Sequence, residues 1–352
     1  MSARRIALLR QLATIPVFMT DLEFGIETGL GTSQSGDEGR RSEVEISVIV
    51  CTRDRASSLH QFLTSATLLK IPPETSWELL IVDNGSTDST AEIIVSFTDR
   101  LPIKRLWQAE PGLSMARNFG IGQAAGKYIL WTDDDVLLER EWLAAYREAF
   151  RRWPDAAVFG GKVTPLVKEP TPVWFRSALP DLGFLLAARD FGDKPIALTV
   201  EGDRVPFGAN FAIRADVQRR YPFDPALGVA PGRRRGGEEI AVISAILRSG
   251  KEGWWVPDAA VAHVISTDRQ TTAYISRYYG GMGEQDAFSR LVSHSPPILG
   301  APLSTWVKLP IAFLRYRLAR LARLNCWVRY FSSYAYHRGA LEYWLTPPAR
   351  RR

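Results

Sequence analysis

Short apolar runs alternate with segments of helical periodicity from residue 46 onward. Uninterrupted apolar runs predict buried strands at 46–51, 77–82, 103–107 and 127–132. Apolar residues that recur every three or four positions predict helices at 57–69, from 89 and at 114–125. This alternation is typical of right-handed βαβ units, which build a mostly parallel sheet with helices on both faces. We therefore predict an α/β fold.

The pattern is less regular after residue 140. It predicts a helix at 140–153, strands at 156–160 and 207–213, a helix at 238–248, and short strands at 254–257 and 259–265. Residues 164–206 are rich in proline and are expected to form a long irregular insertion. At the N-terminus we expect a short amphipathic helix over 4–12 and a flexible linker over 25–45.

These patterns divide the chain into three parts. Residues 1–45 form an N-terminal segment with a linker, residues 46–270 the α/β domain, and residues 271–352 a basic helical extension. In the extension, apolar positions between Val307 and Tyr330 share one helical face and predict a single basic amphipathic helix. The glycine-rich run at 280–283 is interpreted as a mobile hinge.

The composition is that of a globular protein. Hydrophobic residues make up 46% and charged residues 23% of the 352 residues, which excludes a wholly disordered chain. The two cysteines, Cys51 and Cys326, exclude a disulfide framework and a multi-cysteine zinc site, and they favour a reducing compartment. The sequence predicts neither a secretory signal nor a membrane-spanning helix, so we expect a cytoplasmic protein.

The net charge of +6 comes from the C-terminus. Residues 301–352 contain ten Lys and Arg against one acidic residue, whereas the rest of the chain is slightly acidic. A basic amphipathic helix with Trp306 and Trp327 suits an anionic membrane surface and predicts peripheral attachment to the cytoplasmic membrane face. A helix that packs on the α/β domain, with its arginines in water, fits the pattern equally. No nucleic-acid partner is expected, because no recognition fold accompanies the charge.

Polar residues follow three of the predicted strands. Thr52 and Arg53 follow the first strand, Asp83 ends the second, and Asp133-Asp134-Asp135 follow the fourth. Parallel sheets bind their ligands beyond the carboxyl ends of the strands. Because adjacent carboxylates repel one another, the Asp cluster predicts a divalent cation, with a solvated turn or a helix N-cap as the alternative. Asp83 either accepts hydrogen bonds from a nucleobase or ribose, or forms a turn.

Four motifs of this first half occur in a recognisable order, at 47–55, 81–88, 111–118 and 131–135. The series resembles the inverting family 2 glycosyltransferases, which have the GT-A fold, and the resemblance extends from about residue 46 to residue 265. It implies a Rossmann-like, mostly parallel central sheet flanked by helices, with the C-terminal helical extension beyond it. Residues 46–270 would then be a catalytic domain.

The resemblance also implies roles for residues in these motifs. The nucleotide pocket that it implies contains Thr52, Arg53, Asp83, Arg117 and Asp133. Asp133 and Asp135 would form a DxD element that binds Mn²⁺ or Mg²⁺, with Asp135 as the direct ligand. His263 occupies a place where several family members have a histidine near the metal diphosphate, and a buried core histidine is the alternative.

Two later segments extend the resemblance. Residues 206–214 look like the family's strand beside the sugar and the acceptor, which implies roles there for Gly208 and Asn210. Glu239 aligns with the family's catalytic base, where Asp is commoner, and its neighbour Glu238 is the other candidate. Both glutamates also fit an acidic helix start that the helix dipole favours.

The function implied is transfer of a single sugar, with inversion, from a nucleoside-diphosphate sugar to a hydroxyl group, with UDP-sugars favoured as donors. The acceptor would be a glycan or a lipid-linked molecule in the synthesis of a polysaccharide, glycolipid or other glycoconjugate. The chain lacks the Gln-x-x-Arg-Trp element of the family's processive synthases. The alternatives are a catalytically inactive subunit that binds nucleotide sugars and a sugar-nucleotide pyrophosphorylase, although residues 51–55 replace the Gly-rich loop of the latter.

Overall fold

The four apolar runs predicted in the first half of the chain form neighbouring strands of one sheet in the computed structural model, which describes residues 44–291 and 299–347. Four parallel strands are β1 (Ile46–Thr52), β2 (Trp77–Asp83), β3 (Ile103–Trp107) and β4 (Tyr128–Asp133). The helices between them are α2 (Ala56–Ala66), α3 (Thr90–Val95) and α4 (Leu113–Gln123). The sequence prediction of this half is confirmed to within a few residues. The helix expected at 4–12 lies outside the described residues, as does nearly all of the linker.

The second half of the sheet is less regular, as expected. Its strands are β5 (Val136–Leu138), β6 (Val158–Val167), β7 (Asn210–Arg214) and β8 (Gly253–Ile265), and the order across the sheet is β3-β2-β1-β4-β7-β6-β8-β5. Only β7 and β5 run antiparallel to their neighbours, so the described sheet is mostly parallel.

Two strand predictions in this half are wrong in extent. The strand expected at 156–160 continues to Val167, and the two short strands expected at 254–265 are one strand, β8. A register shift between Gly161 and Lys162 explains both, because it lets the β6–β8 pairing pass over the residues around Pro257. Proline is tolerated at such a bulge, although it would interrupt regular pairing.

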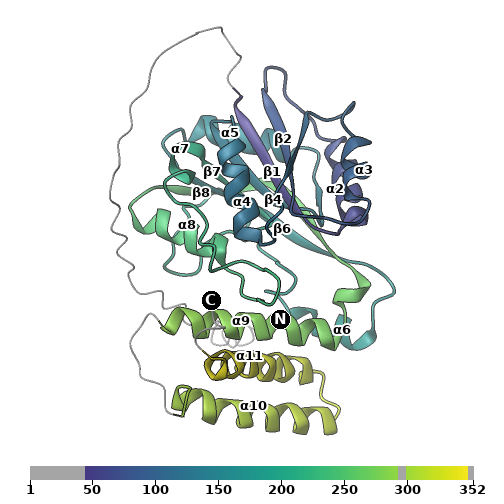
Figure 1. Ribbon diagram of the computed structural model, residues 1–352, viewed down its shortest axis with the longest axis vertical. Coiled ribbons are helices and arrows are strands. Elements are labelled where there is room, and N and C mark those ends of the chain that lie inside the picture. Colours follow the sequence, from purple (N-terminus) through teal and green to yellow (C-terminus); the bar gives the residue numbers. More distant parts are fainter. Residues whose placement is uncertain (1–43, 292–298, 348–352) are drawn as a thin grey trace.

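Helices cover both faces of the sheet (Figure 1). Alternate strand residues point to opposite faces. Val48 and Ile81 belong to the core formed with α2 and α5 (Trp142–Arg152), whereas Ile49 and Val82 belong to the core formed with α4 and α8 (Glu238–Arg248). The bounds of α8 agree with the sequence prediction. The short helix α7 (Ala215–Gln218) follows β7.

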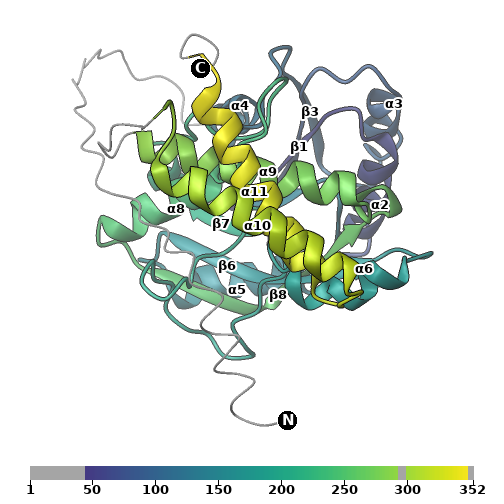
Figure 2. The ribbon, with the colours of Figure 1, turned by 90° about the horizontal axis from the view of Figure 1, so that it is seen from below.

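The C-terminal extension consists of three helices, α9 (Thr272–Leu291), α10 (Leu303–Leu321) and α11 (Trp327–Leu345), in the part of the chain that the structure describes. They form a layer against one side of the α/β domain, and α11 lies between α9 and α10 (Figures 1 and 2). The insertion contributes α6 (Val173–Ala178) and a following segment whose Leu182 and Leu185 share an apolar cluster with all three helices. Within residues 44–291 and 299–347, no helix combines the length and apolar character needed to span a bilayer.

The single helix predicted over 307–330 is wrong, because the chain reverses direction between α10 and α11. Arg323 adopts a left-handed conformation with φ of 50°, and the Leu324 N–H donates to the Ala319 carbonyl oxygen at 2.9 Å. This is a helix-closing arrangement in which glycine is the usual left-handed residue. Since arginine occupies that position here, the apolar periodicity gives no sign of the break.

The glycine run at 280–283 is not a hinge but part of α9. Its glycines allow α9 to approach α11 closely. A Cβ atom at Gly283 would collide with the backbone of Tyr336, and one at Gly339 of α11 would collide with the backbone of Gly280. The loss of helix propensity at these glycines is therefore offset by close helix packing.

We expect Gly339→Ala to lower the free energy of unfolding by about 1–3 kcal/mol, because the new methyl group overpacks the α9–α11 contact. The matched control is Gly122→Ala in α4, where a Cβ atom meets nothing within 4 Å. That substitution should be neutral or stabilising, by up to about 1 kcal/mol. Urea unfolding of both variants measures the difference. Equal stabilities would show that the glycines do not set the distance between α9 and α11.

Candidate active site

The sheet register brings the polar strand ends to one edge. Thr52 pairs with Asp83 across β1 and β2, and Cys51 pairs with Asp133 across β1 and β4. Asn210, which begins the antiparallel strand β7, pairs with Thr132 and so lies at the same edge. The structure therefore brings together residues predicted from motifs about 160 positions apart, as parallel sheets do with the ends of their strands.

Asp134 is buried beneath this edge and is held by the first strand. Its carboxylate accepts hydrogen bonds from Thr52 Oγ1 at 2.7 Å and from Arg55 Nη1 at 2.6 Å. Burial raises the pKa of Asp134 to about 7, although the Arg55 charge acts against this. Thr52, predicted to contact a nucleotide, thus uses its hydroxyl proton to position the Asp cluster.

Asp135 lies among three nitrogen-bearing side chains. Its Oδ2 accepts hydrogen bonds from Arg55 Nη2 at 2.7 Å and from Arg269, while its Oδ1 lies 3.6 Å from His263 Nε2. Burial alone would raise the pKa of Asp135, but the contact with His263 and the charges of His263, Arg55 and Arg269 hold it well below its usual range. Asp135 is therefore ionised at neutral pH.

The His263 ring is oriented by the insertion. Its Nδ1 lies 2.9 Å from the Leu186 carbonyl oxygen, to which only an N–H can donate. Nε2 faces Asp135 at 3.6 Å. Burial lowers the pKa of His263, but the contact with Asp135 outweighs it and raises that pKa, so a cation at this place would have to displace the Nε2 proton. Metal-binding histidines commonly have such an outer hydrogen bond to a backbone carbonyl. The structure thus brings His263 to the Asp cluster.

The donor set fits a divalent cation that is shared with a substrate. No group of three or more His, Cys, Asp or Glu side chains is arranged around an ion site within the described residues. Mg²⁺ and similar cations are often held by only one or two carboxylates together with substrate phosphates. Asp135 and His263 Nε2, 3.6 Å apart, could supply two such protein ligands, whereas Asp133, whose side chain is 37% exposed, lies 3.6 Å from Arg117.

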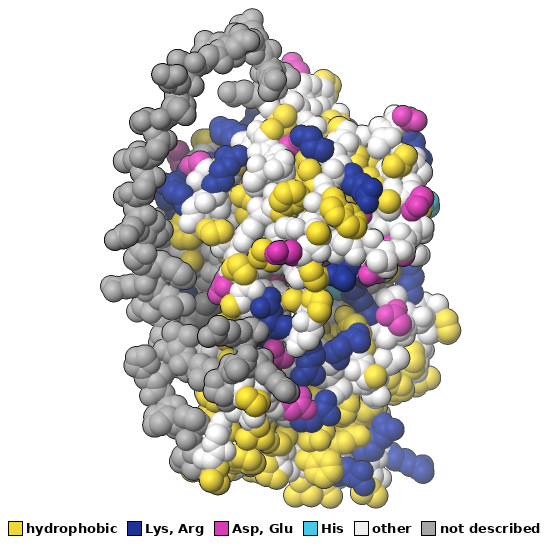
Figure 3. Space-filling view, viewed as in Figure 1, with side chains coloured by type: hydrophobic (Ala, Val, Ile, Leu, Met, Phe, Trp, Pro, Cys, Tyr) yellow, Lys and Arg dark blue, Asp and Glu magenta, His cyan; other side chains and the backbone are white. Residues whose placement is uncertain are grey.

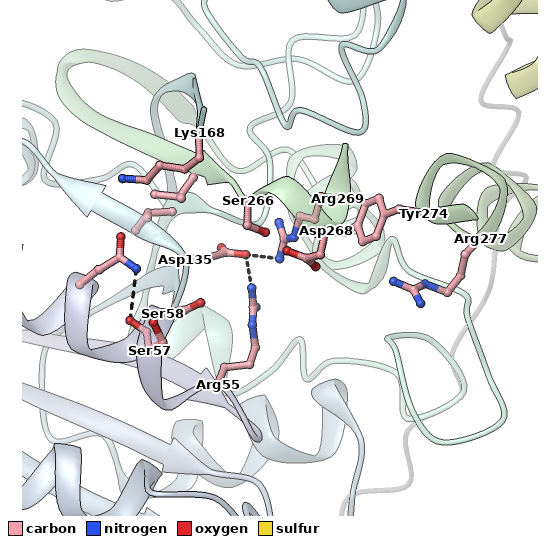
Figure 4. A pocket seen from close by; sticks show the side chains of 13 residues that line it. Arg55, Ser57, Ser58, Asp135, Lys168, Ser266, Asp268, Arg269, Tyr274 and Arg277 are labelled. Carbon is pink, nitrogen blue, oxygen red and sulfur yellow. Dashed lines mark hydrogen bonds and ion pairs between the residues drawn. The ribbon is translucent and has the colours of Figure 1, made fainter. Parts of the chain in front are cut away.

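A cavity of about 480 Å³ opens beside Asp135 (Figure 4). Four basic residues line it: Arg55, Lys168, Arg269 and Arg277. Figure 4 shows Arg55, the residue before α2, and Arg269, from the segment after β8, both reaching Asp135. Since only Asp135 and Asp268 are acidic among the lining residues, the cavity suits a phosphate-bearing ligand. The sequence pattern did not predict that these four basic residues form part of the site, although Arg55 belongs to the motif at 47–55.

Arg117 links the Asp cluster to the two candidate bases. Its guanidinium is buried, with Nη1 at 2.7 Å from Glu238 Oε1 and Nη2 at 3.6 Å from Asp133 Oδ1. The ring of Phe223 lies 5.2 Å from the guanidinium carbon. The structure therefore places Arg117 between carboxylates, and neither Arg117 nor the two glutamates are among the residues that line the basic cavity.

Glu238 and Glu239 have different surroundings, which the sequence could not show. Glu238 is 3% exposed and makes the close pair with Arg117, whereas Glu239 is 17% exposed and lies 4.0 Å from the same guanidinium. Burial and the negative charge of Glu238 together raise the pKa of Glu239 to about 7. Gly208 lies directly against Glu239, since a Cβ atom there would be 3.0 Å from Oε1.

Asp83 and Arg53, both predicted to contact the nucleotide, lie at the same edge. The Asp83 carboxylate is buried, pairs with Arg105 Nη2 at 2.7 Å and accepts the Ser86 N–H at 3.0 Å. The Arg53 side chain is 42% exposed and lies 3.6 Å from Asp54. Asp83 is thus fixed in orientation, whereas Arg53 is exposed to solvent.

The side-chain amide of Asn210 is hydrogen-bonded entirely to neighbouring parts of the fold. Its Oδ1 accepts hydrogen bonds from the Trp142 indole and the Tyr146 hydroxyl, each at 2.8 Å. Its Nδ2 donates to the carbonyl oxygens of Lys162 at 2.9 Å and Ala259 at 2.7 Å. These four contacts use the full hydrogen-bonding capacity of the amide. The geometry therefore favours a role in joining β6, β7 and β8 over the predicted contact with a sugar.

The chain is similar to known glycosyltransferases in sequence. Residues 47–214 match the family model described as Glycosyl transferase family 2. The succinoglycan biosynthesis protein ExoM of Rhizobium meliloti (strain 1021) is 23% identical over 241 residues, which cover 66% of this chain and 71% of that protein. The pre-mycofactocin glycosyltransferase of Mycobacterium tuberculosis is 22% identical over 285 residues, which cover 80% of this chain and 56% of that protein.

Solved structures show the same fold at low sequence identity. The mannosyltransferase PcManGT from Pyrobaculum calidifontis, in complex with GDP-Man and Mn²⁺, has a TM-score of 0.55 and 19% identity, covering 85% of this chain and 86% of that one. Residues 1–349 of S. aureus TarS give a TM-score of 0.51 and 16% identity, covering 85% of this chain and 91% of that one. Three observations point to the same family: the Asp cluster at the strand ends of the sheet, the matching family model and the fold of these neighbours. The chain therefore belongs to glycosyl transferase family 2, has the GT-A fold and is a glycosyltransferase.

Proposed function

We propose that the enzyme transfers one sugar from a nucleoside-diphosphate sugar to an acceptor hydroxyl, with inversion at the anomeric carbon. The observation that carries this proposal is the arrangement around residues 133–135. Asp135 lines a cavity together with four basic residues, and Asp133 lies 3.6 Å from Arg117, which also lies 4.0 Å from Glu239, a glutamate whose pKa is raised. In this proposal the diphosphate binds in the cavity and Glu239 acts from the far side of the sugar. A leaving diphosphate and a base on opposite sides of the sugar are what inversion requires.

The donor binds, in this proposal, along the carboxyl ends of β1, β2 and β4. Asp83 and Arg53 would contact the nucleoside, and the cations of the cavity would contact the diphosphate. The neighbouring structures carry donors of this class, since one TarS structure contains UDP-GlcNAc and the PcManGT structure contains GDP-Man. We favour a UDP-sugar.

Negative charge develops on the diphosphate as the sugar leaves. Arg55 and Arg269 can turn from Asp135 toward the diphosphate and stabilise that charge. Mn²⁺ or Mg²⁺, held by Asp135 with Asp133 and His263, would supply Lewis-acid stabilisation of the same oxygens. The PcManGT structure contains Mn²⁺, which supports this choice of cofactor.

Glu239 is the base in this proposal, and Glu238 positions Arg117. A general base must be ionised near neutral pH and have a proton affinity close to that pH. Glu239 meets this requirement, because its pKa is about 7 and no cation lies as close to it as Arg117 lies to Glu238. Gly208 leaves room beside the Glu239 carboxylate for the acceptor hydroxyl.

The acceptor is a hydroxyl-bearing glycan or a lipid-linked molecule, and the product belongs to a polysaccharide, glycolipid or related glycoconjugate. The relation to a succinoglycan biosynthesis protein supports this setting. The insertion at 164–206 borders His263 and the three C-terminal helices, and we infer that it shapes the choice of acceptor.

Product formation from a panel of nucleotide sugars tests the proposal directly. With Mn²⁺ or Mg²⁺, one donor should raise the melting temperature of the enzyme, because a ligand that binds only the folded state stabilises it. The same donor should give an inverted glycoside with a suitable acceptor, and EDTA should abolish the transfer. Donor binding without any transfer across a broad acceptor panel would identify a binding subunit instead. Formation of a sugar phosphate and a nucleoside triphosphate from the donor and pyrophosphate would identify a pyrophosphorylase.

Glu239→Gln and Glu238→Gln should separate catalysis from structure. Glu239→Gln should lower kcat by about 10²–10⁴-fold, since the base is lost, without lowering the melting temperature. Glu238→Gln should destabilise the fold by about 3–5 kcal/mol, because it leaves the buried Arg117 without its closest counter-charge. Transfer rates and thermal unfolding of the two variants provide the measurements. A fully active Glu239→Gln enzyme would exclude this residue as the base.

A further inference from the structure

Helix α10 has an apolar surface that the described part of the chain leaves uncovered. Its six residues are between 45% and 75% exposed: Leu303, Val307, Ile311, Leu314, Leu318 and Leu321. They follow one another at intervals of three or four positions, so they form one continuous line along the helix. We refer to these six residues as the α10 stripe. Aliphatic side chains that gather in this way on a surface mark an interaction site.

The α10 stripe is separate from the face that holds α10 in the fold. Thr305, Ala312 and Ala319 are the buried residues of α10, and they lie on the opposite side of the helix, toward α11. Figure 2 shows α10 as an outer element of the helical layer. The six stripe residues are therefore not needed to attach α10 to α11.

Basic residues border the stripe on both sides. By helical periodicity, Lys308 and Arg315 flank one edge of the stripe and Arg317 flanks the other, whereas the guanidinium of Arg320 lies over the ring of Trp327 of α11, at 4.2 Å from its centre. All four basic residues are exposed. The sequence contains no acidic residue from 287 to 341. Figure 3 shows apolar side chains over the lower end of the molecule, where α10 lies, with Lys and Arg side chains beside them.

We propose that the α10 stripe docks the enzyme on the surface of an anionic phospholipid bilayer, with α10 lying in the plane of the membrane. An interfacial helix buries its apolar face about 5–10 Å deep, at the boundary between headgroups and acyl chains. Lysine and arginine at the edges of such a face extend to the headgroups, where anionic lipids attract them. The stripe and its flanking cations have this arrangement, and α11 supports the helix from behind.

Charge argues against a second copy of the chain as the occupant. A symmetric contact between two stripes would bring the flanking cations of the two copies together, because such interfaces are self-complementary. The described α10 has no carboxylate to compensate them. Anionic lipids remove this repulsion, so the bilayer is the partner that fits the surface.

Docking through α10 would hold the proposed active site near the membrane. Helix α9 contributes Tyr274 and Arg277 to the basic cavity and packs on α11, which packs on α10. With about 8–10 Å between neighbouring helix axes, the cavity lies roughly 20 Å above the plane of α10. This distance suits a lipid-linked acceptor whose sugar extends from the bilayer, a consequence that rests on the proposed function. The docking itself does not depend on it.

Vesicle co-sedimentation of the full chain tests the docking. The wild-type protein should bind vesicles of phosphatidylcholine with phosphatidylglycerol, bind pure phosphatidylcholine about tenfold more weakly, and leave the anionic vesicles at high salt. Leu314→Gln with Leu318→Gln should lower binding to anionic vesicles by about tenfold or more without changing the melting temperature. The matched control is Leu68→Gln with Val95→Gln, which replaces two residues that are 61% and 64% exposed near α2 and in α3. This control should bind as the wild type does.

Three results would overturn the proposal. The wild-type protein could fail to bind anionic vesicles at low salt, or the Leu314/Leu318 variant could bind them as well as the control. Light scattering could also show a wild-type dimer that the Leu314/Leu318 variant converts to a monomer, which would make a second copy the occupant. Glu239→Gln should bind vesicles normally, so a failure of docking and a failure of the proposed transfer are distinguishable.

Discussion

The rest of the site depends on electrostatic compensation at the carboxyl edge of the sheet. Five carboxylates gather there in a largely buried space: Asp133, Asp134, Asp135, Glu238 and Glu239. Buried like charges repel one another and lose hydration, so such a group is stable only with counter-charges, bound protons or a cation. Arg55 bridges Asp134 and Asp135, and Arg117 lies between Asp133 and Glu238. These arginines make the carboxylate cluster compatible with a folded core.

The same compensation gives two neighbouring glutamates different electrostatic environments. Arg117 makes its close pair with Glu238 at 2.7 Å, whereas it lies 4.0 Å from Glu239. Glu239 thus lies in a largely buried site beside the negative charge of Glu238, and among the described residues no salt bridge to Glu239 is as short as that of Arg117 to Glu238. The pKa of Glu239 is consequently about 7. A carboxylate with that proton affinity can accept a proton from an acceptor hydroxyl far better than an ordinary surface glutamate can.

The C-terminal helices support this pair through the loop that precedes α8. Arg234 Nη2 lies 3.0 Å from Glu342 of α11, and Arg235 Nε lies 3.7 Å from Glu284 of α9. The Arg235 guanidinium also lies over the ring of Phe288, at 4.3 Å from its centre. Because this loop leads directly into Glu238, the helical layer is part of the physical support of the site, although the sequence pattern separates it as an extension beyond residue 270.

Local patterns in the sequence predicted strands β1 to β4, helix α8 and the convergence of the strand ends, because those features depend on periodicity and on parallel pairing. The basic cavity escaped prediction, since Lys168, Arg269 and Arg277 come from separate elements whose approach depends on the β6–β8 pairing and on α9. The α10–α11 turn escaped because Arg323 stands where glycine is usual. The environments of Glu238 and Glu239 depend on the position of one buried arginine, which no spacing along the chain reveals.

The pH dependence of kcat/KM tests whether burial and the charge of Glu238 tune Glu239 to act as the proposed base. Glu239 must be ionised to accept a proton, so activity should fall about tenfold per pH unit below an apparent pKa of about 7. In Glu238→Gln the neighbouring negative charge is removed, so this acid limb should move to lower pH. An acid limb near the ordinary glutamate pKa of about 4.3, or one that does not move in Glu238→Gln, would contradict the account.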